Sequence, residues 1–118
     1  MATFFPRRKT YSPSRAAAAV VTGAAHGIGR SFAYEIVRRG GSVICTDIDE
    51  GQLKKTTREL GELGEGRVIP YVCDVRSESG MKKLSEEAEV LLGRPVSLLV
   101  NNAGVAAGGK IGEMPLED

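Results

Sequence analysis

The residues with the clearest chemical potential form a glycine-rich stretch, Thr22–Gly29 (TGAAHGIG), between a short apolar run and a segment of helical periodicity. A helix N-terminus presents unpaired N–H groups and a partial positive charge, and a phosphate reaches them only where side chains are absent. Gly23 is expected to make the turn, Gly27 to admit a pyrophosphate and Gly29 to let the helix pack closely on the strand. The stretch predicts a phosphate-binding loop; the alternative is a plain glycine-rich turn.

An acidic residue stands where the next apolar run ends. Asp47 follows Gly29 by 18 residues, which is where a dinucleotide-binding fold holds the adenosine ribose through a carboxylate. A carboxylate there also repels a 2′-phosphate, so the sequence favours NAD over NADP as cofactor. Two alternatives stay open: Asp47 simply begins the next helix cap alongside Asp49, or the basic side chains of His26 and Arg30 soften the preference.

Four apolar runs alternate with three segments of helical periodicity. Short continuous apolar runs are typical of strands buried on both faces of a parallel sheet. The alternation predicts an α/β fold in which right-handed crossovers join the strands into a parallel sheet. The expected strands are Ala16–Thr22, Ser42–Thr46, Arg67–Val72 and Val96–Val100, with a helix over Ile28–Arg39 between the first two.

Local signals refine this plan. Asp49 is expected to cap the second helix with Gln52 as its capping-box partner, and Ser77 to cap the third. Pro70 cannot donate a hydrogen bond to a ladder, so the third strand is predicted at a sheet edge. A stripe at helical spacing is expected to bury the first helix: Ile28, Phe32, Ala33, Ile36 and Val37.

Composition excludes several classes of function. The 118 residues carry 16 basic and 15 acidic side chains, which gives no basic surplus for a nucleic-acid partner. No apolar run approaches the ~20 residues of a membrane span. With one histidine and two separated cysteines, no metal-ligand spacing exists. Cys45 and Cys73 are expected to be buried, reduced thiols, which indicates a cytoplasmic location.

The charge is uneven at the N-terminus. Residues 1–15 (MATFFPRRKTYSPSR) contain basic residues and no acids, and are expected to form a flexible leader. A transit peptide has a similar composition, although Pro6 and Pro13 oppose a regular amphipathic helix. Residues 16–118 are expected to be the N-terminal part of a single dinucleotide-binding domain.

Two later motifs complete a resemblance. Asp74-Val75 follows the third strand, and Asn101-Asn102-Ala103-Gly104 follows the fourth. Together with the glycine loop, in this order, they resemble the N-terminal half of a short-chain dehydrogenase/reductase. The resemblance implies a fold of the Rossmann type, a doubly wound parallel sheet represented by its first four strands in the order 3-2-1-4. In that family the Asp-Val pair contacts the adenine, and the Asn-Asn-Ala-Gly motif steadies the sheet and lines the ribose on the nicotinamide side. The resemblance implies these cofactor-binding residues: Gly23, Ala25, Gly27, Ile28, Gly29, Asp47, Asp74, Val75, Asn101, Ala103 and Gly104.

The family's catalytic residues have no counterpart in this sequence. Its chemistry rests on a Ser and a Tyr-x-x-x-Lys, in which the Tyr exchanges a proton with the substrate oxygen. The three tyrosines here are followed four residues later by Arg15, Arg38 and Val75, so we predict no catalytic residue.

We therefore expect the NAD-binding half of an oxidoreductase acting on secondary alcohols or ketones, without activity of its own. By the same resemblance, the substrate would bind only in a full-length, homo-oligomeric parent. The alternative is a non-catalytic nucleotide-binding module. A methyltransferase is less favoured, because Asn-Asn-Ala-Gly has no role in one.

Overall fold

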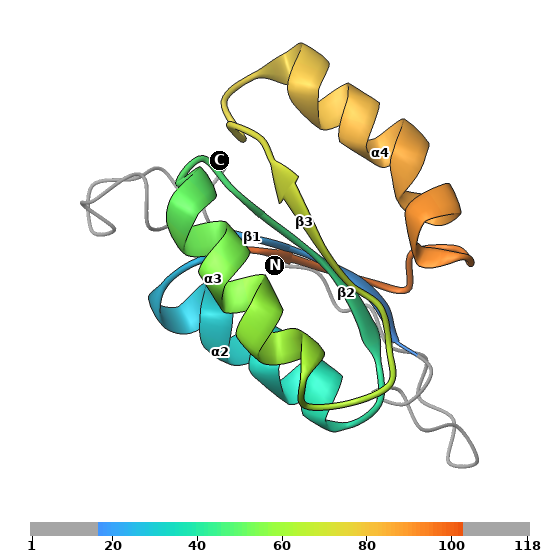
Figure 1. Ribbon diagram of the computed structural model, residues 1–118. Helices are drawn as coiled ribbons and strands as arrows, with labels where there is room; N and C mark the ends of the chain where they lie inside the picture. The colour runs from blue at the N-terminus through green and yellow to red at the C-terminus, as the bar shows by residue number, and fades with distance from the viewer. Residues whose placement is uncertain (1–16, 103–118) are drawn as a thin grey trace.

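The computed structural model describes residues 17–102, in which four strands alternate with three helices (Figure 1). The expected leader, Ala103 and Gly104 lie outside the described residues. The strands are β1 (Ala18–Thr22), β2 (Ser42–Asp47), β3 (Val68–Val72) and β4 (Leu98–Asn101), and the helices are α2 (Gly27–Arg38), α3 (Glu50–Gly61) and α4 (Glu78–Leu92).

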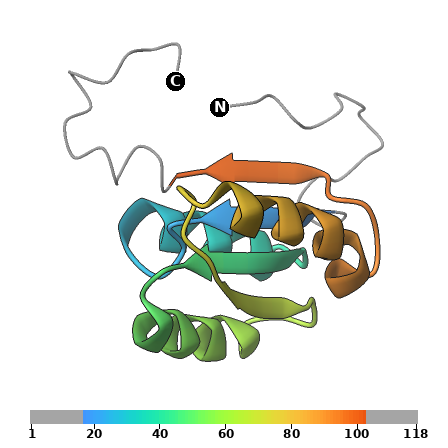
Figure 2. The same ribbon diagram turned by 90° about the horizontal axis from the view of Figure 1, so that it is seen from above.

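The strands form one parallel sheet in the order β3-β2-β1-β4, which confirms the predicted topology. Figure 2 shows β4 at one edge and β3 at the other. Pro70 lies on β3 opposite Cys45 of β2, at the edge where a residue without an N–H is tolerated. The chain moves outward in opposite directions from β1, so the gap between the β1 and β4 loops is the switch point where α/β folds bind ligands.

Helices cover both faces of the sheet. Alternate strand residues point to opposite faces, so Val21 and Cys45 join the core beneath α2 and α3, while Val20 and Ile44 join the core beneath α4 (Figure 1). Every residue of β1 is buried. This two-sided burial is why the central strands are continuous apolar runs in the sequence.

The predicted apolar stripe of α2 is wrong at two positions. Ala33, Ile36 and Val37 are buried, but Ile28 is 67% exposed and Phe32 42% exposed. The helix turns Gly29 toward the sheet, and each of the two exposed residues precedes a buried one by about 100° of helical rotation. Close packing at a glycine therefore set the helix face, and not the largest side chains.

The helix caps agree with the prediction except in one detail. Asp49 accepts a hydrogen bond from the Gln52 N–H at 3.1 Å, and Ser77 caps α4. The reciprocal half of the expected capping box is absent, because the Gln52 side-chain amide donates to the Thr56 hydroxyl (3.4 Å). The Asp49 N–H is instead held by the Asp47 carboxylate at 3.0 Å.

Candidate functional site

The loops that follow the four strands meet at one edge of the sheet, because the strands are parallel. Nearly all of the predicted site residues that the structure describes lie on these loops or in the first turn of α2; Asp47 and Asn101 are the last residues of β2 and β4. The described members are Gly23, Ala25, Gly27, Ile28, Gly29, Asp47, Asp74, Val75 and Asn101.

The inner side of the glycine loop is fastened to β2 and α3. Gly23 has a positive φ of 65° and makes the turn out of β1. The Ala25 N–H then donates to the Asp47 carboxylate at 3.0 Å, and the Ala25 carbonyl accepts from the buried Thr56 hydroxyl at 3.1 Å. These bonds hold the loop in place and leave its outer side open.

The two glycines that begin α2 differ in their surroundings. A Cβ on Gly29 would lie 2.2 Å from the Gly23 carbonyl oxygen and 2.8 Å from Asn102 Nδ2, so only glycine fits there. Gly27 has a φ of 55°, and a Cβ built on it meets no atom within 4 Å. Gly29 thus permits close packing of the helix, while Gly27 keeps an open approach to the helix N-terminus.

The N-terminus of α2 has no side-chain cap among the described residues. His26 precedes α2 in an extended conformation, yet its side chain makes no capping hydrogen bond, and the first turn holds no acid. By contrast, α3 and α4 are capped by Asp49 and Ser77 and carry Glu50 and Glu78 in their first turns. Among the described helices, α2 therefore has the N-terminus best arranged for an external anion.

Asp47 lies half-buried between the glycine loop and α3. Its carboxylate accepts from the backbone N–H groups of Ala25 and Asp49, each at 3.0 Å. Within residues 17–102 it forms no ion pair, and its remaining lone pairs can accept from hydroxyl groups. Four other acids near this edge or on the helices beginning there are paired with basic side chains: Asp49 with His26, Glu50 with Lys54, Glu59 with Arg30 and Asp74 with Arg76.

Asp74 and Val75 form the loop between β3 and α4. The Asp74 carboxylate accepts from the Arg76 backbone N–H (2.9 Å) and from its guanidinium (3.1 Å). These contacts lower the pKa of Asp74 below its usual range. Val75 follows it in the chain and is half-buried. We call the partly apolar surface of Asp74 and Val75 the ledge.

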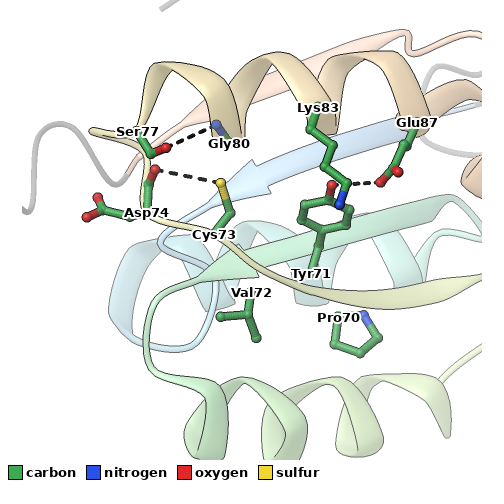
Figure 3. A pocket seen from close by; sticks show the side chains of 9 residues that line it. All are labelled: Pro70, Tyr71, Val72, Cys73, Asp74, Ser77, Gly80, Lys83 and Glu87. Carbon is green, nitrogen blue, oxygen red and sulfur yellow. Dashed lines mark hydrogen bonds between the residues drawn. The ribbon is translucent and has the colours of Figure 1, made fainter.

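An open hollow of about 540 Å³ lies beside this ledge, between β3 and α4 (Figure 3). In it the Tyr71 hydroxyl donates to Glu87 at 2.7 Å. Burial and Glu87 raise the pKa of Tyr71 to about 12, and burial raises that of Cys73. Because the hollow lies over the edge strand β3 and away from the switch point between β1 and β4, we place the candidate site at the glycine loop instead.

The end of β4 is tied to β1 and to the glycine loop. The Thr22 hydroxyl donates to Asn101 Oδ1 at 3.2 Å, and Asn102 Nδ2 donates to the Gly23 carbonyl at 3.4 Å. Asn102 was missed as a site residue, although the doubled asparagine marked its position. Thr56 was missed as well, and no local sequence signal could have connected it with Ala25.

Residues 17–118 match the family model described as short chain dehydrogenase. The chain belongs to the short-chain dehydrogenase family. It is 40% identical over 98 residues to the CLA biosynthesis dehydrogenase/reductase of Lactiplantibacillus plantarum, covering 83% of this chain and 34% of that protein. It is 37% identical over 100 residues to the 7alpha-hydroxysteroid dehydrogenase of Escherichia coli, covering 85% and 38%. The chain thus spans about a third of the length of these relatives.

Solved structures of this family share the fold. The crystal structure of hydroxysteroid dehydrogenase from Escherichia coli superimposes with a TM-score of 0.68 at 37% identity, over 85% of this chain and 40% of that one. A short chain dehydrogenase/reductase from Burkholderia phymatum, crystallised in complex with NAD, gives 0.69 at 32% identity, over 75% and 31%.

The described part of this short-chain dehydrogenase chain contains two tyrosines, and neither is followed by a lysine four residues later. Tyr34 is 40% exposed on α2, and Tyr71 has the raised pKa given above. No group of three or more metal-ligating side chains that could hold an ion occurs in residues 17–102. None of the helices there has the length and apolar character needed to span a bilayer.

Proposed function

We propose that this chain binds NAD at the carboxyl edge of its sheet, as the cofactor-binding part of a short-chain oxidoreductase. The observation that carries the proposal is the contrast among helix N-termini. Only α2, among the described helices, begins without a side-chain cap or an acid, and Gly27 keeps its approach free of side-chain atoms. An anionic pyrophosphate complements that arrangement.

Each part of the cofactor has a candidate partner in this chain. The first turn of α2, with Gly27 and Ile28, would receive the pyrophosphate, and Asp47 the hydroxyls of the adenosine ribose. The ledge of Asp74 and Val75 would lie against the adenine. Gly23, Ala25 and Gly29 shape the loop, while Asn101, Ala103 and Gly104 would line the ribose on the nicotinamide side.

The preference for NAD over NADP rests on Asp47. Its carboxylate has backbone N–H partners and no basic partner among residues 17–102. A 2′-phosphate on a ribose held there would meet an uncompensated negative charge. The NAD found in the Burkholderia phymatum relative is consistent with this choice.

In the whole protein, we propose hydride transfer between NAD(H) and a secondary alcohol or ketone. The cofactor, when bound, supplies the hydride chemistry, and this chain's residues bind and orient it. The proton donor to the substrate oxygen would come from a part of the family's fold that this chain does not span. We expect the parent protein to be a cytoplasmic homo-oligomer. The second candidate is a non-catalytic nucleotide-binding module, because none of the three tyrosines of this sequence is followed by a lysine four residues later.

Titration of the purified chain with NADH and NADPH tests the binding proposal. We expect NADH to bind about tenfold or more tightly, a difference of about 1.4 kcal/mol or more. Asp47→Ala should narrow the gap, because it removes both the hydroxyl acceptor and the repulsion. Glu65→Ala, an equal charge change in the exposed α3–β3 loop, is the control and should leave the gap unchanged. Binding of neither nucleotide would contradict the function, and equal or tighter NADPH binding would contradict the preference.

A further inference from the structure

One side-chain contact joins the two loops that flank Asp47. His26 Nε2 lies 3.1 Å from Asp49 Oδ2, although the residues are 23 apart in sequence. His26 belongs to the glycine loop, and Asp49 to the turn between β2 and α3. Asp47 connects the same two loops from below, through the N–H groups of Ala25 and Asp49. The hydrogen bonds of all three side chains therefore bridge the same two loops, those of Asp47 through backbone N–H groups and that of His26 with Asp49 through side chains.

We propose that Asp49 is a second determinant of cofactor choice, which acts by keeping the His26 imidazole away from the 2′ position of the adenosine ribose. The inference rests on the proposed function. A substituent on a ribose held by Asp47 would lie next to His26 and Asp49, because both adjoin the backbone groups that Asp47 binds. Asp49 then weakens the binding of a 2′-phosphate in two ways. Its own negative charge repels the phosphate, and it holds the His26 imidazole, which could otherwise donate a hydrogen bond to the phosphate.

Several properties of His26 suit it to bind a 2′-phosphate when Asp49 does not hold it. It is the single histidine of the chain, its side chain is 60% exposed, and an imidazole can donate to a phosphate oxygen. Two other cationic side chains, one on α2 and one on α3, form ion pairs with glutamates. Arg30 pairs with Glu59 at 2.7 Å, and Lys54 pairs with Glu50 at 3.0 Å.

The two oxygens of Asp49 have separate partners, which makes its roles separable. Oδ1 accepts the capping bond from the Gln52 N–H at 3.1 Å, while Oδ2 faces His26. In Asp49→Asn the amide oxygen can keep the cap, since Asn and Asp cap helices about equally well. The amide nitrogen that replaces Oδ2 cannot accept from His26. In either tautomer of His26, the substitution therefore leaves the imidazole N–H without the Asp49 acceptor and does not uncap α3.

The experiment measures the dissociation constants of NADH and NADPH for the full 118-residue chain and three variants. In Asp49→Asn we expect the NADPH/NADH ratio of dissociation constants to fall by about fivefold to tenfold through a new charge-assisted phosphate contact, with NADH binding within about twofold of the parent. Adding His26→Ala to Asp49→Asn should raise the NADPH/NADH ratio most of the way back to the parent value, because the imidazole donor is then removed. Glu59→Gln, which removes the same charge from the partner of Arg30, is the matched control and should leave the ratio unchanged.

The outcomes separate this inference from the function on which it rests. An unchanged ratio in Asp49→Asn, with NADH still bound, overturns the inference alone. An equal ratio in Asp49→Asn and in the double variant also overturns it, because the charge of Asp49 would then act without His26. A matching fall in Glu59→Gln overturns it as a general charge effect. Failure of the unaltered chain to bind either nucleotide overturns both proposals.

Discussion

Helices α2 and α3 begin side by side at the same edge of the sheet, and their first turns are built in opposite ways. In α3 the Asp49 carboxylate accepts a hydrogen bond from an N–H group of the first turn, and the negative charge of Glu50 interacts favourably with the helix dipole. Helix α2 has neither, and its N-cap position is filled by His26, which bonds to Asp49 instead. The same backbone physics thus produces an N-terminus capped by a carboxylate in α3 and one without a side-chain cap in α2, where we propose that the phosphates bind.

Glycines in the two first turns show the same contrast. Gly29 of α2 lies against the Gly23 carbonyl, with no room for a methyl group. On Gly51 of α3, a Cβ would approach nothing more closely than Asp49 Oδ1 at 4.0 Å. Glycine is therefore a packing requirement in α2, whereas in α3 it only lowers helix propensity.

The largest expected effect separates these two glycines. Gly29→Ala should lower the free energy of unfolding by about 3 kcal/mol, because the overpacked contact is with backbone and cannot be relieved by a rotamer change. Gly51→Ala should raise it by about 0.5–1 kcal/mol through better helix propensity. Urea unfolding monitored by circular dichroism gives both values. Similar effects of the two substitutions would show that Gly29 is not a packing contact.

A second pair tests whether the open end of α2 binds phosphate. Gly27 is the first residue of α2, and Gly40 follows the end of that helix. Both have a positive φ, and a Cβ built on either meets no atom within 4 Å in the described part of the chain. Gly27→Val and Gly40→Val should each lower the free energy of unfolding by about 2 kcal/mol, because a side chain strains the left-handed backbone.

Only Gly27→Val should also weaken NADH binding, by more than about tenfold, since its side chain would fill the phosphate approach. Calorimetric titration of both folded variants measures this difference. Normal NADH binding by Gly27→Val would mean that the phosphate loop is wrongly assigned.

The N-cap residues provide a smaller contrast. Ser77 accepts from the Gly80 N–H at 3.0 Å, so Ser77→Ala should lower the free energy of unfolding by about 1 kcal/mol. His26→Ala removes no cap and only an exposed pair, so its effect should stay below about 0.5 kcal/mol. Thermal unfolding of both variants checks this order. A larger loss for His26→Ala would indicate that α2 is capped after all.

The smallest effect distinguishes a charged cap from a neutral one. The Gln52 N–H, and then the His26 side chain, hold the pKa of Asp49 below its usual 3.8. Because the folded value is the lower one, the stability that Asp49 contributes is fully present above about pH 4 and is lost as the pH falls through the folded value. The stability gap between the parent and Asp49→Ala should therefore shrink on acidification, whereas the gap for Ser77→Ala should not. Unfolding curves from pH 7 to pH 3 measure both gaps, and parallel behaviour would contradict the assignment.

The sequence by itself determined the layout of the molecule. Apolar runs and helical periods predicted the order of elements, and a parallel sheet followed because a helix between two strands makes a crossover connection. The order of the strands in the sheet was predicted from the resemblance that the motifs carry. Pro70 marked the edge strand, and Asp49 and Ser77 marked two helix starts. These signals succeeded because each depends on the local backbone or on burial of a whole element.

The tertiary structure alone decided which groups meet between the loops. Ile28 points to solvent because Gly29 must face Gly23, and Asp47 took the N–H that a capping box would have given to Gln52. The contact of His26 with Asp49 and that of Asn102 with Gly23 span 23 and 79 residues. Such pairings depend on the register of neighbouring parallel strands, which brings distant loop residues to one edge and which no local period in the sequence records.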